Sequence, residues 1–194
     1  MKRAFDTVNR RTYLASTGAV TAGAMGLAGC LGSATGTLAT RVTDQPGDIA
    51  DFESCVVTVV GMWLGPEGAE AGTEEDESPS DREYHEYDDP QQADLVQLQD
   101  GQTQLVEERE LDVANYAFLQ LDIEEIDAVL GDGSDAIVEM PGEAPIMFNR
   151  TFEIREDTRT VFTADFTPVR RGRTDEYLLQ PVPQGIRVEY EDGA

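Results

Sequence analysis

The sequence predicts an all-β fold, and three observations lead to this prediction. Short segments in which apolar and polar residues alternate recur along most of the chain, which is the period of a half-buried strand. Turn-forming residues separate these segments at a spacing of about ten residues, as in sandwich folds. Only two stretches, 102–110 and 122–130, have a spacing that suits a short helix. We therefore expect one domain, an antiparallel β-sandwich of the immunoglobulin-like or prealbumin-like kind.

Residues 37–64 contain the first two predicted strands. Residues 37–44, TLATRVTD, alternate between apolar and polar positions, so we expect a strand with one buried face. The following residues, QPGD, suit a turn. Residues 54–64, SCVVTVVGMWL, are β-branched and apolar on both faces, which is typical of a central strand.

An acidic segment follows this central strand. Eleven carboxylates stand between Glu67 and Asp89, with Arg82 as the one basic residue among them. High charge and low hydrophobicity favour disorder, so we expect a long acidic loop insertion, disordered, over about residues 66–83. Residues 82–89, REYHEYDD, are expected to return to the sheet as an edge strand.

The remaining segments continue the strand pattern. Residues 93–101, ADLVQLQDG, predict a short strand that ends in a turn at Asp100 and Gly101. The alternation from Ala117 to Ile123 predicts another strand, and Asn115 before it suits a turn with positive φ. Further short strands are expected within residues 136–140, 146–154, 158–167 and 177–190.

The first 29 residues differ in composition from the rest of the chain. They contain four basic residues and one aspartate, whereas the other 38 acidic residues lie in residues 30–194. The weakly apolar stretch 15–27 is too short for a membrane-spanning helix, which needs roughly 20 residues. A charged start, a short apolar middle and a small-residue end are the layout of an export signal.

A motif within this segment indicates the export route. The residues NRRTYLA resemble the twin-arginine motif, with Arg10, Arg11, Tyr13 and Leu14 in matching positions. We therefore expect residues 1–29 to be a twin-arginine signal peptide, with the export machinery as a partner.

The end of the segment predicts a lipid anchor. Leu27, Ala28, Gly29 and Cys30 resemble a lipobox, in which the cysteine receives a two-chain lipid and becomes the mature N-terminus. A two-chain lipid is sufficient for stable membrane attachment. Residues 30–36 would then be the lipidated cysteine and a flexible tether, and residues 37–190 the sandwich domain. We expect the protein on the outer face of the cytoplasmic membrane, with the membrane as its partner.

The cysteine count supports an inert second thiol. If Cys30 carries a lipid, Cys55 has no partner in the chain for a disulfide. Cys55 lies in an apolar run, so a buried, unreactive thiol is the expected state.

The charge balance indicates a saline environment. The chain has 39 acidic and 14 basic residues, a formal net charge of -25, and 40% apolar residues. Such charge repels itself over about 10 Å at 0.1 M salt but over only about 3 Å at 1 M salt. A folded halophilic protein fits these values better than an acidic disordered chain. Nucleic-acid binding is disfavoured, because it needs clustered basic residues.

Three stretches resemble domain-of-unknown-function family 4382, which occurs in exported archaeal and bacterial proteins. Residues 35–48 resemble its opening strand and Thr-Asp-x-Pro turn, and residues 94–123 resemble its central block, with Asn115 in place of the usual Gly. Residues 152–168 together with EYLLQPV, residues 176–182, resemble its closing strands. The resemblance implies a secreted β-sandwich and no particular activity.

Candidate catalytic residues are scarce. His85, the single histidine, is expected on the acidic loop as a solvated side chain, so a nucleophile–histidine–acid arrangement is disfavoured. A zinc site needs several His or Cys ligands, which the sequence lacks. Carboxylate pairs are uninformative in so acidic a chain. We therefore assign no catalytic residue and expect a protein that is not an enzyme.

Binding chemistry leaves three alternatives. Calcium would suit the oxygen groups of residues 131–139, of residues 73–81 and of Asp44, but none has the spacing of an EF-hand, so no metal residue or cofactor is assigned. Four aromatic residues would suit a sugar-binding platform or, alternatively, the core: Trp63, Tyr84, Tyr87 and Phe118. Three arginines would pair with nearby carboxylates or contact an acidic partner: Arg170, Arg171 and Arg173.

These observations predict a noncatalytic, lipid-anchored cell-surface protein of a halophilic archaeon with a structural or binding role in the envelope. The alternative is a calcium- or carbohydrate-binding accessory module of a surface enzyme or transporter. The sequence does not name a ligand.

Overall fold

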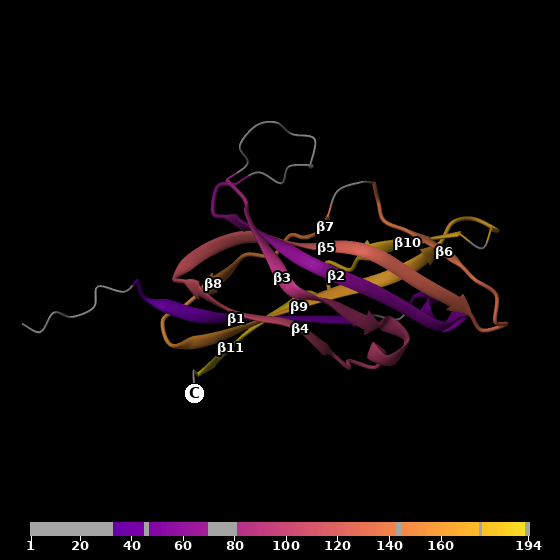
Figure 1. The fold of residues 1–194 in the computed structure, drawn as a ribbon, viewed down its shortest axis with the longest axis horizontal. Helices are drawn as coiled ribbons and strands as arrows, with labels where there is room; N and C mark the ends of the chain where they lie inside the picture. The colour runs from indigo at the N-terminus through magenta and orange to yellow at the C-terminus, as the bar shows by residue number, and fades with distance from the viewer. Residues whose placement is uncertain (1–32, 45–46, 70–80, 143–144, 175, 193–194) are drawn as a thin grey trace, which may run out of the picture. The chain divides into compact units, whose positions relative to one another are not determined.

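Two β-sheets make up the computed structural model, which describes residues 33–44, 47–69, 81–142, 145–174 and 176–192 (Figure 1). A six-stranded sheet has the order β4-β1-β9-β10-β6, with β11 also against β9; a five-stranded sheet has the order β3-β2-β5-β7, with β8 against β5. The strands are β1 (Thr35–Asp44), β2 (Phe52–Pro66), β3 (Glu83–Asp94), β4 (Gln104–Asp112), β5 (Ala114–Leu130), β6 (Ile137–Glu139), β7 (Ile146–Phe148), β8 (Phe152–Ile154), β9 (Thr158–Arg170), β10 (Glu176–Pro181) and β11 (Arg187–Asp192).

The predicted sandwich is confirmed, and one part of its topology was not expected. Most strand pairs are antiparallel, but β1 pairs with β9 in parallel, and so does β6 with β10. A parallel pair needs a long connection between its strands. Between β1 and β9 this connection contains most of the domain, including the whole of the second sheet.

The core lies between the two sheets. From β1 and β2 it includes Leu38, Val42, Val57 and Met62. Aromatic rings from the later strands pack edge to face within it, with centroids 5.1–6.4 Å apart; these rings are Phe148, Phe152, Phe162 and Phe166. Such pairs add to the free energy of burial, so the second half of the chain contributes much of the cohesion of the sandwich.

The two predicted helices are strands. Residues 102–110 lie mostly in β4, and residues 122–130 complete β5. In the β2–β5 pair the register shifts by one residue, because Thr58 is opposite Glu125 and Val59 is opposite Ile123. The bulge changes which positions face the core, and it produces a spacing that imitates a helix.

The segment after β3 corrects two further predictions. Residues Leu95–Leu98 form a 3-10 helix, η2, rather than a strand, with the Asp94 side chain accepting a hydrogen bond from the Val96 backbone N–H. The turn at Asp100 and Gly101 is confirmed, and both have positive φ. Asn115 lies inside β5, opposite Glu153, rather than in a turn. The predicted edge strand is confirmed as β3.

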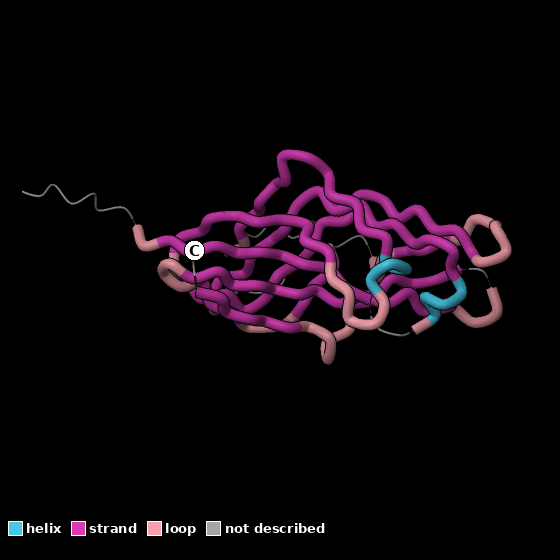
Figure 2. The backbone as a smooth tube through the Cα atoms, turned by 90° about the horizontal axis from the view of Figure 1, so that it is seen from below, coloured by secondary structure: helices cyan, strands magenta, loops and turns pink. Residues whose placement is uncertain are grey.

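The two ends of the sandwich differ. A 3-10 helix, η1 (Asp48–Asp51), and η2 lie near each other at one end, where β1 finishes (Figure 2). At the other end β1 begins and β11 finishes, both beside the start of β9. We call these the helical end and the entry end. Among the described residues no helix has the length and apolar character to cross a membrane.

Several predicted features lie outside the described residues. They are the twin-arginine motif, the lipobox with Cys30, and the central part of the acidic insertion, residues 70–80. Both ends of the range predicted for the insertion, about residues 66–83, belong to strands: Pro66 ends β2 and Glu83 begins β3.

Candidate functional site

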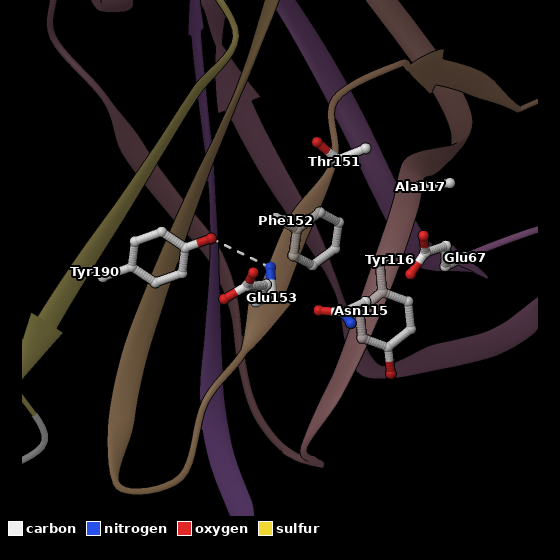
Figure 3. A pocket seen from close by; sticks show the side chains of 8 residues that line it. All are labelled: Glu67, Asn115, Tyr116, Ala117, Thr151, Phe152, Glu153 and Tyr190. Atoms are coloured by element: carbon white, nitrogen blue, oxygen red, sulfur yellow. Dashed lines mark hydrogen bonds between the residues drawn. The ribbon is translucent and has the colours of Figure 1, made fainter.

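A cavity of about 410 Å³ opens at the entry end of the sandwich (Figure 3). Three strands, β5, β8 and β11, contribute to its wall together with the turn after β2 and the residue before β8, so residues far apart in the sequence meet there. The lining residues are Glu67, Asn115, Tyr116, Ala117, Thr151, Phe152, Glu153 and Tyr190. We call this space the entry cavity.

Strand pairing positions the aromatic part of the entry cavity. Tyr116 on β5 is opposite Phe152 on β8, and their rings stack with centroids 5.2 Å apart. Tyr190 on β11 accepts a hydrogen bond of 3.2 Å at its hydroxyl from the Glu153 backbone N–H. Arg155 covers the Tyr190 ring at 3.7 Å and pairs with Glu153 at 2.7 Å. These contacts hold the aromatic side chains of the cavity wall, Tyr116, Phe152 and Tyr190, in place.

Polar groups lie beside these aromatic side chains in the cavity wall. Figure 3 shows the Glu67 carboxylate and the Asn115 amide near the Tyr116 ring, with the Glu153 carboxylate toward Tyr190. Tyr116 and Phe152 are buried and Arg155 covers the Tyr190 ring, so a ligand would be bound mainly by these polar groups. Hydrogen-bond acceptors and donors in a cavity suit a polyhydroxylated ligand, and carboxylates also suit a cationic group.

A second cavity of about 390 Å³ lies between β3 and β4, and Tyr116 lines this cavity as well as the entry cavity. Its polar lining includes Glu83, His85, Glu110 and Asp112. Burial raises the pKa of Tyr116 to about 12, and Glu83 and Asp112 contribute to the same rise. The phenol therefore stays protonated and can donate a hydrogen bond across the physiological range.

His85 lies within β3, so its interpretation as a loop residue is wrong and the edge strand predicted for residues 82–89 contains it. It faces Met62 across the strand pair, and its Nε2 lies 3.8 Å from a Glu83 carboxylate oxygen. Burial, followed by the Arg109 guanidinium, lowers the pKa of the imidazole, against the opposing effect of Glu83. His85 is therefore a half-buried, neutral side chain at the edge of the sandwich.

The four aromatic residues that could form a sugar platform separate into two pairs. Tyr87 and Phe118 are buried. Trp63 and Tyr84 stack on the outer surface of the second sheet with centroids 4.6 Å apart, but the Arg82 guanidinium covers the Trp63 ring at 4.7 Å. The platform is therefore already occupied by a side chain of the same chain.

Two further expectations are met. Cys55 is a buried free thiol, and burial, with Asp94 and Asp44, raises its pKa to about 12, so it is unreactive at neutral pH. Of the three arginines expected to pair with carboxylates, two do so: Arg170, the last residue of β9, lies 3.8 Å from Asp51, and Arg171 pairs with Glu139. For Arg173 the expectation stays a prediction.

The entry cavity could not be found from the sequence. Glu67, Glu153 and Tyr190 carry no local motif, and only the pairing of β5 with β8, together with that of β11 with β9, brings their strands to one end. Within the described ranges, no three His, Cys, Asp or Glu side chains converge on a metal-sized space.

The comparison with protein families identifies the domain. A family model described as Domain of unknown function (DUF4382) matches residues 35–181, from the start of β1 to the end of β10. The chain belongs to this family. The DUF4382 match leaves β11 outside its bounds, although β11 contributes Tyr190 to the entry cavity. Neither the curated proteins nor the solved structures contain a significant match.

Proposed function

We propose that this DUF4382 protein is a lipid-anchored domain on the surface of a halophilic archaeon, with a noncatalytic structural or binding role in the envelope. The twin-arginine motif at Arg10 and Arg11 would direct export, and Cys30 would carry the lipid. The domain would then stand on the outer face of the cytoplasmic membrane.

The observation that carries the proposal is the short distance along the chain between Cys30 and the first strand. β1 begins at Thr35, five residues after Cys30. Five extended residues span at most about 18 Å, so a lipid on Cys30 would hold the entry end close to the membrane. A two-chain lipid at this position would be sufficient for stable attachment of the domain to the membrane.

The surface charge supports a saline setting. Nearly all the described carboxylates are exposed or half-buried, and they cover both sheets and the turns. At the entry end Glu110, Asp112 and Glu153 are exposed. These charges would be repelled by anionic lipid headgroups in dilute salt, whereas at molar salt the repulsion extends only about 3 Å.

Cell fractionation tests the anchor. In a haloarchaeal host, Cys30→Ser should move the protein from the membrane fraction to the medium, whereas Cys55→Ser, which removes the other thiol, should leave it on the membrane. Retention of the Cys30→Ser protein would overturn the anchor. Replacing Arg10 and Arg11 with Lys should leave the protein inside the cell, and unchanged secretion would overturn the twin-arginine assignment.

A second candidate function is carbohydrate binding at the entry cavity, as in an accessory module of a surface enzyme or transporter. The combination of stacked rings, an amide and carboxylates in one cavity favours it. Calorimetry with neutral oligosaccharides in molar KCl is the test. Tyr190→Ala should abolish binding, and Tyr84→Ala should not, since these tyrosines are similarly exposed, at 39% and 40%, but Tyr84 lies outside the cavity. Equal effects of the two variants would contradict this function.

A further inference from the structure

The second cavity collects carboxylates that lack a cationic partner. Glu83 at the start of β3, together with Glu110 and Asp112 at the end of β4, lines this space of about 390 Å³. In the part of the chain that the structure describes, none of the three pairs with an arginine. Glu83 has only His85 at 3.8 Å, and that imidazole is neutral because burial lowers its pKa. The negative charge of the cavity is therefore not compensated by the protein.

The cavity occupies an opening between the edges of the two sheets. β3 is an edge of the five-stranded sheet, and β4 is an edge of the six-stranded one. Toward the helical end, side chains of β4 bridge the two edges, since the Gln104 amide donates to the Gln92 carbonyl and Arg109 donates to the Glu86 carbonyl at 2.7 Å. The cavity lies beyond Arg109, toward the entry end. The gap is thus bridged on its helical side and open where the carboxylates gather.

Tyr116 supplies an independent sign that this opening holds a ligand. The residue is only 4% exposed, and Figure 3 shows its hydroxyl directed away from the other side chains of the entry cavity. The hydroxyl lies on the side of the second cavity, because Glu83 and Asp112 both contribute to the rise of its pKa. It makes no hydrogen bond to any residue in the described ranges. A hydroxyl buried to this degree is normally hydrogen-bonded, so a molecule in the second cavity is expected to be its partner.

His85 adds a second polar atom without a partner. Its Nε2 is buried and makes no hydrogen bond within the described chain. One ring nitrogen of a neutral imidazole accepts a hydrogen bond, and so does a phenol oxygen. Arg109 influences the His85 imidazole, but its guanidinium is already held by the Glu86 carbonyl and, at 3.3 Å, by the Glu107 carboxylate. The cavity therefore offers several acceptors and lacks positively charged donors.

The size of the cavity and the spread of its acceptors indicate the class of ligand. A volume of about 390 Å³ is within the range of small-molecule sites. The acceptors come from β3, β4 and β5, and no three ligating side chains of the described residues are close enough to hold a metal ion. A cation with several N–H groups on a carbon frame matches this arrangement better than a single inorganic ion.

We propose that the second cavity binds an organic amine in its cationic form. The ammonium group donates hydrogen bonds to the carboxylates of Glu83, Glu110 and Asp112, and the Tyr116 oxygen accepts another. The shared chemistry is a primary alkylammonium group, which either a free diamine or a lysine side chain of a partner protein provides. The proposal does not depend on the lipid anchor or on carbohydrate binding.

Calorimetry with simple amines tests the proposal. The purified full-length chain in molar KCl at neutral pH is titrated with diaminopentane, and we expect saturable binding of one molecule per chain. Pentanediol has a similar length and no charge, so it should not bind. A lysine with both backbone ends capped represents the side chain of a partner. Binding of the capped lysine as well as the diamine would identify a receptor for lysine side chains, and binding of the diamine alone would identify a small-molecule site; both support the alkylammonium assignment.

Removal of charge separates the cavity from the general acidity of the surface. The double variant Glu110→Gln and Asp112→Asn should abolish binding of diaminopentane. The control, Glu124→Gln and Asp127→Asn, removes the same charge from exposed positions on the far half of β5 and should bind as the parent does. Circular dichroism establishes that both proteins are folded.

Tyr116→Phe tests the buried hydroxyl itself. The variant keeps the ring that stacks on Phe152 and removes only the oxygen. Loss of a hydrogen bond to a charged group should weaken amine binding by about tenfold or more. Tyr190→Ala, which alters the entry cavity alone, should leave amine binding unchanged.

Four results would overturn the proposal. They are the absence of saturable heat with either amine, equal binding of pentanediol, equal effects of the two double variants, and unchanged affinity in Tyr116→Phe. Because this binding is measured on purified protein, its failure is distinct from failure of the anchor, which is measured in cells. It is also distinct from failure of carbohydrate binding, which Tyr190→Ala reports.

Discussion

The two ends of β1 place the same chemical group in opposite environments. At the entry end, beside Thr35, the carboxylates of Glu110 and Asp112 line a cavity that is open to solvent. At the helical end, some nine residues and about 30 Å along the strand, Asp44 is sealed from solvent. The first group of carboxylates is stabilised by water and salt, and the second is not.

This contrast shows that acidity has two separate physical consequences in this domain. Exposed carboxylates act together, through the net field that they produce, and no single one matters much. Buried carboxylates act individually, because each must be neutralised by a specific partner. A count of acidic residues therefore predicts a response to salt but says nothing about where a particular ion binds.

Salt concentration should produce the largest effect, because it acts on all the exposed charges together. Dilution from molar KCl to ~0.1 M extends the screening length from roughly 3 Å to about 10 Å, so repulsion among exposed carboxylates should unfold the domain. Circular dichroism during dilution measures this. An unchanged spectrum at ~0.1 M salt would show that the exposed charge is not limiting for stability.

A pH titration should give the next largest effect, and it depends on the buried end. The pKa of Asp44 is about 8 in the folded chain and near 3.8 in an unfolded one, so the folded state holds a proton that the unfolded state releases. The free energy of unfolding should therefore fall by about 1.4 kcal/mol per pH unit as the pH rises between these values.

The difference between the parent and Asp44→Asn isolates this effect from the many exposed carboxylates. Denaturant unfolding at constant molar salt is the measurement. Asp165 and the Cys55 thiol also interact with Asp44, so the titration belongs to this group rather than to one residue. A parent and a variant with parallel pH profiles would contradict the raised pKa.

Gly185→Ala should destabilise the domain by about 1–3 kcal/mol, because the added methyl group collides with the Asp165 carboxylate. Gly131→Ala is the matched control, since its new methyl group would meet only the Asp51 carbonyl oxygen, at an ordinary 3.6 Å. Urea unfolding of both variants measures the difference. Equal stabilities would mean that Asp165 does not fill the space at Gly185.

An exposed ion pair should give the smallest effect. Arg159 lies between Glu108 and Glu191, with both contacts at 2.7 Å. A double-mutant cycle of Arg159→Ala with Glu108→Ala should give a coupling energy of about 0.5–1 kcal/mol at low ionic strength, and less at molar salt. A coupling energy above this range in molar salt would show that a single exposed carboxylate also contributes individually to stability, as a buried one does.

The sequence was sufficient for the strands whose side chains alternate without interruption. β1 and β2 are found close to their predicted bounds, because Leu38 and Val42 face the core and Val57 lies in a strand that neighbours cover on both sides. These are local patterns, and the burial of one face or of both is enough to produce them.

The wrong secondary-structure predictions have a common cause. A bulge or a short 3-10 turn, which depends on tertiary structure, changes the local pattern of apolar residues. Ile123 and Ile126 are three residues apart, as in a helix, because a bulge shifts the phase of β5. Leu95 and Leu98, both buried, form one face of a 3-10 turn that the Asp94 side chain begins. Neither the bulge nor the 3-10 turn has a sequence pattern that is stronger than the local periodicity around it.

The candidate sites were predictable to different degrees. The sequence drew attention to Asp44 as an oxygen-bearing residue, but not to the burial of Asp44 and Asp165, which depends on the packing of β1 and β9 within the domain. His85 was interpreted as a loop residue although it belongs to residues 82–89, which were predicted as an edge strand; the structure places it in that strand. The entry cavity depends on three strands, β5, β8 and β11, so topology alone produces it.

The pairing of β1 with β9 also has a consequence for the time at which the protein can fold. The first strand of the domain finds its parallel neighbour about 120 residues later in the chain, and contacts over such separations make folding slow. β9 is the central strand of the six-stranded sheet, so this sheet cannot form until the ribosome has made most of the domain. A chain that must be almost complete before it acquires its structure suits an export route that carries folded cargo, and that is the route which Arg10 and Arg11 predict.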